Sequence, residues 1–169
     1  MPNWVKTVVH AVKDDVNFED FTNENGDFSF EKIIPMPDDI YRGNLGQEET
    51  AKYGEKNWYS WSIEHWGTKW DACEPNIYND GRSVEFDTAW SVAAPVLGEL
   101  GKMVGGIIVF YADEGDDANS GMFIVHKDGT IEDMGTEAVS YLAIYSGKSP
   151  YEREDVVEEY YWKFEGDDE

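Results

Sequence analysis

Two hairpin signals constrain the fold of this chain more than any other feature. Asn79-Asp80-Gly81 and Lys127-Asp128-Gly129 each stand between two segments that can form strands. Turns of this composition join neighbouring antiparallel strands. The flanking segments are residues 77–78 and 83–90 around the first turn, and residues 122–126 and 130–134 around the second. The chain is therefore expected to contain an antiparallel sheet.

Hydrophobic periodicity predicts the elements around these hairpins. Residues 4–12 and 107–111 have the composition of strands, and residues 58–66 and 95–103 carry apolar side chains at helical spacing. The resulting order of strand, helix, strand, strand, helix, strand matches a split β-α-β sheet, with two helices on one face. The predicted class is α+β, a ferredoxin-like antiparallel sheet with an added C-terminal hairpin and helix.

Three further segments complete the predicted structure. Residues 28–34 predict a short strand, residues 137–145 a helix, and residues 155–164 an amphipathic helix or strand. The strand at residues 83–90 alternates, which places one set of side chains on a common face: Val84, Phe86, Thr88 and Trp90.

The length of 169 residues suits a single domain. We expect a ferredoxin-like core at 1–134 with an insert at 13–56, and an acidic helical C-terminal extension at 135–169. Cys73 is the single cysteine, which excludes an internal disulfide. No apolar run approaches the length of a membrane span, and the N-terminus lacks the features of a signal peptide. The sequence therefore predicts a cytoplasmic protein without a membrane segment.

The composition is strongly acidic. Asp and Glu total 36 against 13 Lys and Arg, which gives a formal net charge of −23. Residues 151–169 alone hold nine acids and two bases. Such a surface repels phosphate, so direct binding of nucleic acid is not expected. Its charge suits a basic protein partner, whereas solubility alone is the alternative explanation of the acidity.

Several motifs resemble the YubB/Api-like ferredoxin-like domain family over residues 1–123. They are Met1-Pro2-Asn3-Trp4, Phe30 with Ile33-Ile34-Pro35-Met36-Pro37, Trp66-Gly67-Thr68-Lys69-Trp70-Asp71-Ala72, Phe86-Asp87-Thr88-Ala89-Trp90-Ser91, Tyr111-Ala112-Asp113-Glu114-Gly115 and Gly121-Met122-Phe123. The chain departs from the family after Ser91, where it has one proline, Pro95, in place of the usual two. The family is carried largely by phages, plasmids and integrative elements and has no established biochemical activity. The resemblance thus implies a ferredoxin-like fold and a mobile-element origin.

The Trp-Gly-Thr-Lys-Trp-Asp run predicts a ligand site, because aromatic walls with a few polar groups are typical of small-molecule pockets. Its candidate residues are Trp66, Thr68, Lys69, Trp70, Asp71, Asp87, Thr88 and Trp90. A structural explanation of the same residues stays open. The tryptophans would then form the core between helix and sheet, with Lys69 paired to Asp71 or Asp87 and the indole N–H groups bonded to nearby acceptors.

No catalytic residue, metal site or cofactor is predicted. His65, Glu64, Asp71 and Cys73 do not follow the ligand spacing of zinc sites. No nucleophile elbow supports a Cys73-His65-Asp71 triad, and the acidic loop at 113–119 lacks the ligand spacing of a calcium loop. The chain also has no P-loop and no G-x-G-x-x-G motif. Binding of RNA on sheet aromatics is rejected because the accompanying basic residues are missing.

The C-terminal segment predicts an interaction surface, because tyrosine and tryptophan among charges often anchor protein interfaces. Its candidate residues are Glu154, Glu158, Glu159, Tyr160 and Trp162. An ordinary helix that packs its aromatic face on the domain and solvates its acids is the alternative.

Two classes of function follow from these observations. The favoured one is an interaction module that binds a basic host or mobile-element protein, in its sharpest form an anti-defence or nucleic-acid-mimic inhibitor. The alternative is a small-ligand binder or enzyme that uses the Trp-Gly-Thr-Lys-Trp-Asp pocket.

Overall fold

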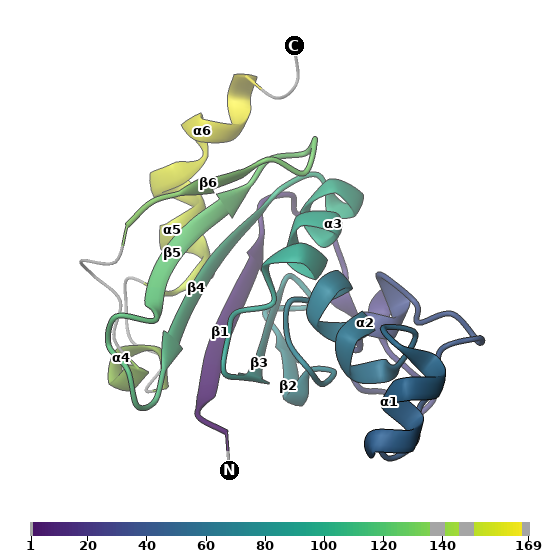
Figure 1. The fold of residues 1–169 in the computed structure, drawn as a ribbon. Coiled ribbons are helices and arrows are strands. Elements are labelled where there is room, and N and C mark those ends of the chain that lie inside the picture. Colours follow the sequence, from purple (N-terminus) through teal and green to yellow (C-terminus); the bar gives the residue numbers. More distant parts are fainter. Residues whose placement is uncertain (1, 136–140, 146–150, 167–169) are drawn as a thin grey trace.

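Strand β1 (Trp4–Ala11) lies inside a six-stranded antiparallel sheet. The computed structural model describes residues 2–135, 141–145 and 151–166 (Figure 1). The strand order is β2-β3-β1-β4-β5-β6, with β2 at Cys73–Tyr78, β3 at Ser83–Ala89, β4 at Ile107–Asp113, β5 at Ser120–Val125 and β6 at Ile131–Asp133. β1 separates β3 from β4, as the split β-α-β arrangement requires. The α+β ferredoxin-like class is confirmed, and β5 and β6 extend the sheet beyond β4.

Two helices cover one face of the sheet, as predicted. Helix α2 (Trp58–His65) begins at Asn57, whose side chain accepts a hydrogen bond from the Ser60 amide at 2.8 Å and so caps the helix. Helix α3 (Ala94–Val104) has a proline in its first turn and ends at Gly105, which adopts a left-handed conformation. The helices and the sheet enclose a core that includes Trp61, Phe86, Leu97, Leu100 and Val125.

Close packing of α3 on the sheet depends on Gly101. A Cβ atom at this position would overlap with the side chain of Val125. Only glycine therefore lets the helix approach β5 this closely.

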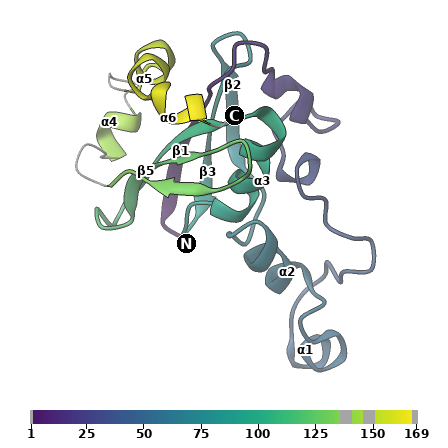
Figure 2. The same cartoon turned by 90° about the horizontal axis from the view of Figure 1, so that it is seen from above.

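The opposite face of the sheet is covered by the C-terminal segment, as Figure 2 shows. This cover consists of α4 (Tyr141–Tyr145), α5 (Arg153–Tyr160) and α6 (Trp162–Glu165). They enclose a second core with the sheet, which includes Val8, Ile108, Phe110, Ile124, Ile144, Tyr151, Val156 and Phe164. Residues 141–145 of the predicted helix at 137–145 are helical, and its first four residues lie outside the described part. The segment predicted as a helix or strand at 155–164 is helical.

A buried arginine fixes this cover to the sheet. Arg153 is fully enclosed, and its Nε donates to the Ala11 carbonyl at 3.0 Å. Its two terminal nitrogens reach Asp14 Oδ1 at 2.9 Å and Glu154 Oε1 at 2.7 Å. The guanidinium therefore joins the first turn of α5 to the end of β1.

The strand predicted at residues 28–34 is wrong. The segment forms a short 3₁₀ helix at Phe30–Lys32. The Ser29 hydroxyl accepts from the Glu31 amide, and the Asp71 carboxylate accepts from the Phe30 amide at 2.7 Å. These side chains bind the backbone in place of a neighbouring strand.

Trp90 also departs from its predicted position on the strand face with Val84 and Phe86. β3 ends at Ala89, and Trp90 has a φ of 69° with 53% of its surface exposed. The turn is held because the Trp90 amide donates to the Asn3 carbonyl at 2.9 Å and the Thr88 hydroxyl donates to the Ser91 carbonyl at 2.6 Å. The indole consequently faces away from the core.

A further 3₁₀ helix spans Phe18–Phe21. Helix α1 (Gln47–Tyr53) lies apart from the sheet and buries none of its residues (Figure 1). Within the part of the chain that the structure describes, no helix has the length and apolar character needed to cross a membrane.

Candidate functional site

The first part of the Trp-Gly-Thr-Lys-Trp-Asp run is built into the core. Trp66 is 4% exposed, its Nε1 donates to the Ile34 carbonyl at 2.9 Å, and its ring meets Phe30 edge-on at 5.8 Å between centroids. Thr68 is fully buried and donates to the Ala89 carbonyl at 3.0 Å. These contacts join the loop after α2 to the end of β3.

Asp71 organises the loop before β2. Its Oδ1 accepts from the amides of Phe30 and Ala72, each at 2.7 Å, and its Oδ2 accepts from the Ser29 hydroxyl at 2.5 Å. Because both carboxylate oxygens are engaged, Asp71 holds the 3₁₀ turn against this loop.

Lys69 and Trp70 lie at the surface. The Lys69 ammonium stands 4.1 Å from the centroid of the Trp70 ring, which is a cation–π contact. Trp70 in turn lies 6.0 Å from Trp4 between ring centroids. Among the described residues Lys69 forms no ion pair, so its expected pairing with Asp71 or Asp87 is wrong. Asp71 is occupied by backbone amides and the Ser29 hydroxyl, and Asp87 lies across from Lys6 and Cys73 in the sheet.

Asp87 and Thr88 occupy opposite faces of β3 because side chains alternate along a strand. Asp87 lies across from Lys6 on β1 and from Cys73 on β2. Burial raises the pKa of the Asp87 carboxyl, and the nearby Lys6 opposes that change. Its Oδ1 is buried without a hydrogen-bond partner among the described residues. The Lys6 ammonium lies 3.6 Å from the Glu85 carboxylate instead.

The structure therefore divides the eight candidate ligand residues. Trp66, Thr68, Asp71 and Thr88 stabilise the junction of α2, β2 and β3. Lys69 and Trp70 stack on its surface, Trp90 is exposed, and Asp87 faces the C-terminal cover. The eight residues therefore do not border the one pocket that the sequence predicted. Strand alternation places Asp87 on the other face from Thr88, and the turn at Trp90 exposes its indole ring.

The five candidate residues of the C-terminal interaction surface do not all lie at the surface. Glu154, Glu158, Glu159 and Trp162 are exposed, whereas Tyr160 is partly buried against the second core. Burial and the Glu159 carboxylate raise the pKa of the Tyr160 hydroxyl. The neighbouring Tyr161, which the sequence analysis did not select, is also exposed. Helices α5 and α6 thus turn Val156 and Phe164 inward and present carboxylates and aromatic rings to solvent.

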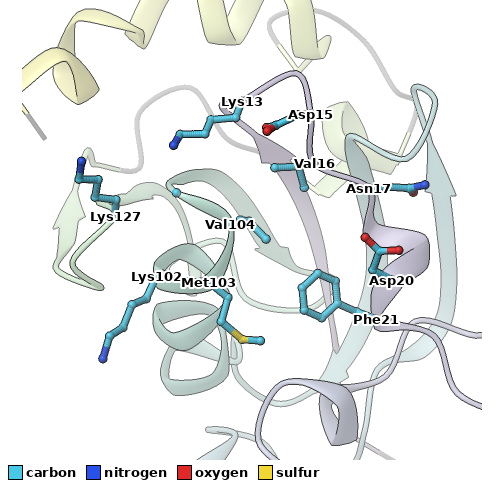
Figure 3. A pocket seen from close by; sticks show the side chains of 11 residues that line it. Lys13, Asp15, Val16, Asn17, Asp20, Phe21, Lys102, Met103, Val104 and Lys127 are labelled. Carbon is cyan, nitrogen blue, oxygen red and sulfur yellow. The ribbon is translucent and has the colours of Figure 1, made fainter. Parts of the chain in front are cut away.

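Sequence reasoning missed one concave feature. A groove of about 560 Å³ lies between the segment that follows β1 and the end of α3 (Figure 3). Its lining residues are Lys13, Asp15, Val16, Asn17, Asp20, Phe21, Lys102, Met103, Val104, Gly105 and Lys127. They come from three distant parts of the chain, so no local motif could have revealed the groove.

No group of three or more His, Cys, Asp or Glu side chains is arranged to hold a metal ion among the described residues.

Comparisons with known proteins give one family match. A family model described as the ferredoxin-like domain in Api92-like protein matches residues 65–161, which is more than half of the chain. The match thus includes α4 and α5, which lie beyond the resemblance seen in the sequence, and it begins only at the end of α2. No curated protein matches the chain.

One solved structure is similar, the protein Api92 from Yersinia pseudotuberculosis. It shares 14% sequence identity with a TM-score of 0.42, over 65% of this chain and 40% of that chain. The chain thus matches less than half the length of that protein.

Proposed function

This chain belongs to the family of ferredoxin-like domains in Api92-like proteins, and from this premise we propose that it is a protein–protein interaction module for a basic partner. The partner is a protein of the host or of a mobile element that carries the gene, and the encounter takes place in the cytoplasm. The proposal assigns residues 1–134, with the insert at 13–56, to the scaffold. It assigns the extension at 135–169 to binding.

The observation that carries the proposal is the exposure of large aromatic rings on a firmly attached segment. Trp162 is 62% exposed, and the adjacent Tyr161 is also exposed. Arg153, Val156 and Phe164 meanwhile hold α5 and α6 against the sheet. Tryptophan and tyrosine are the residue types that most often dominate binding energy at interfaces. A fixed backbone reduces the ordering cost when they bind.

The charge around these rings defines the partner. Glu154, Glu158 and Glu159 are exposed on α5, and the whole chain carries a formal charge of −23. Complementary charges steer association and discriminate against partners of the same sign. The partner should therefore present lysine or arginine around an apolar pocket that accepts Trp162.

The sharpest form of the proposal is inhibition by mimicry of nucleic-acid charge. A protein that normally binds phosphates would be occupied by the carboxylates of α5, and nucleic acid would compete with this chain for one basic surface. The excess of 36 acids over 13 bases supports this form. An anti-defence role would follow if the occupied protein is a nucleic-acid enzyme of the host.

The test starts with affinity capture from host lysate at about 50 mM and about 500 mM salt, followed by measurement of the dissociation constant with the purified partner. We expect a basic partner that is retained at low salt and released at high salt. Trp162→Ala should weaken its binding at least about tenfold, the size of a hot-spot truncation. Tyr59→Ala is the matched control, because Tyr59 is 46% exposed on α2.

Competition then separates the two forms of the proposal. Duplex DNA should displace the chain from the partner if mimicry operates, whereas displacement should fail if the partner uses a separate surface. Failure to retain any basic protein at low salt would refute the interaction module itself, as would equal losses from Trp162→Ala and Tyr59→Ala.

The small-ligand alternative at the Trp-Gly-Thr-Lys-Trp-Asp run receives weaker support. The polar atoms of the run already form hydrogen bonds within the chain, as seen for Trp66, Thr68 and Asp71. Asp87 lies on the opposite face of the sheet from these three residues.

A further inference from the structure

The groove at the end of α3 has an unusual charge for this protein. Lys13 extends from the segment after β1, Lys102 from the last turn of α3, and Lys127 from the hairpin between β5 and β6 (Figure 3). Three of the 13 basic residues of the chain thus line one groove. In a chain with almost three acids per base, such a concentration of lysines requires an explanation.

Two of these lysines have no acidic partner among the described residues. Lys13 and Lys102 form no ion pair there, although other basic side chains do. Lys6 pairs with Glu85, and Arg153 pairs with Asp14. An unpaired ammonium beside a cavity is available to an anionic ligand.

The three lysines of the groove lie on one side of it, although the Asp15 carboxylate is also there. Figure 3 shows the three lysine side chains on one side of the groove, with Asp15 beside Lys13, then Met103 and Phe21, and Asp20 on the opposite side. Phe21 and Met103 supply the apolar middle, and Met103 is one of the exposed large hydrophobic residues of the chain. A ligand that matches this order carries an anion, a flat apolar body and hydrogen-bond donors, in that sequence.

We propose that this groove binds a small molecule with a phosphate at one end and a planar ring at the other, the chemistry of a nucleoside monophosphate. Lys13 and Lys102 neutralise the phosphate, the ring packs on Phe21, and the Asp20 carboxylate accepts hydrogen bonds from hydroxyl or amino groups. The volume of about 560 Å³ lies within the range of small-ligand pockets.

The charge of the whole chain explains why the ligand is small. A nucleic-acid strand would place many phosphates against a surface with a net charge of −23. A single phosphate group interacts mainly with the charges within about 8 Å at physiological salt, because more distant charges are screened. This binding is independent of the proposed protein interface at Trp162, so either can fail without the other.

The experiment follows backbone amides of the intact chain by two-dimensional NMR during titration with adenosine 5′-monophosphate, adenosine and inorganic phosphate. We expect saturable shifts at Phe21, Val104 and Gly105 with adenosine 5′-monophosphate. The other two probes should bind at least about tenfold more weakly, because each makes only part of the contacts. Equal affinity for inorganic phosphate, or no saturable response to the nucleotide, would overturn the proposal.

Variants identify the groups that bind. The double change Lys13→Gln and Lys102→Gln should weaken nucleotide binding about tenfold or more. The control is Lys32→Gln with Lys52→Gln, which removes the same charge outside the groove and should leave affinity unchanged within about twofold. Phe21→Leu should weaken binding of the nucleotide while leaving inorganic phosphate unaffected.

A purely structural role of the lysines would give another result. Lys102 lies in the last turn of α3, where a cation stabilises the helix dipole. If the double variant unfolds at lower temperature but binds the nucleotide with unchanged affinity, the lysines serve the helix alone and the proposal is wrong.

Discussion

Acidification should destabilise this protein through His10. This histidine is fully buried on β1 and lies in a chain of hydrogen bonds. Asn79 Nδ2 donates to Ser83 Oγ at 2.9 Å, Ser83 Oγ lies 2.7 Å from His10 Nδ1, and His10 Nε2 lies 2.6 Å from the Tyr151 carbonyl. A carbonyl can only accept, so Nε2 carries the proton and Nδ1 of the neutral ring accepts from Ser83.

Burial lowers the pKa of His10 to about 4. The hydrogen bond to the Tyr151 carbonyl raises this pKa, and the nearby positive charge of Arg153 lowers it further. The ring is therefore neutral in the folded state, whereas the unfolded chain binds a proton near pH 6.5. The contribution of the neutral His10 ring to the free energy of unfolding is therefore fully present above pH 6.5, and it is lost as the pH falls toward 4. The linkage between protonation and folding predicts that the free energy of unfolding falls by about 2 kcal/mol between neutral pH and pH 5.0. The fall reaches about 3 kcal/mol at a pH below the folded-state pKa.

The assay is urea unfolding of the wild type and of His10→Gln at pH 7.5 and pH 5.0. Because many carboxylates also titrate in acid, only the difference between the two proteins isolates His10. We expect the wild type to lose about 2 kcal/mol more than the variant between these pH values. Equal losses in both proteins, or an imidazole that titrates near pH 6.5 in the folded state by NMR, would refute the reasoning.

Two further changes test the contacts between the sheet and its C-terminal cover. Asp87→Asn should raise the free energy of unfolding at pH 7, because burial raises the pKa of Asp87 and the folded state therefore disfavours its charged form. The exposed Asp38→Asn is its control in urea unfolding, and the gain should disappear as the pH falls through the raised pKa. Arg153→Met should lower the free energy of unfolding by about 2 kcal/mol, because the Ala11 carbonyl loses its donor in a buried site. Asp14→Asn should cost far less, since the Asp14 side chain is largely exposed, and equal effects of the two changes would argue against an anchoring role of Arg153.

The candidate sites show where sequence reasoning reached its limit. The exposure of Glu154, Glu158, Glu159 and Trp162 follows from the helical spacing of apolar and acidic residues, a local property. The prediction that Asp87 shares a ligand site with Thr68 and Trp66 could not be tested by local patterns. Their relative positions depend on which face of β3 packs against which helix. The groove at the end of α3 could not be predicted from the sequence, because Lys13, Lys102 and Lys127 belong to separate elements.

The sequence by itself determined the antiparallel sheet, the order of its elements and the helices on its first face. Turn residues, strand alternation and helical spacing act over a few residues, so they can be recognised without the rest of the chain. Only the tertiary structure decided that the C-terminal segment covers the second face, through the contact of His10 with Tyr151 and of Arg153 with Ala11. Those contacts join residues about 140 positions apart, and burial there changes the protonation of His10 in a way that no local pattern predicts.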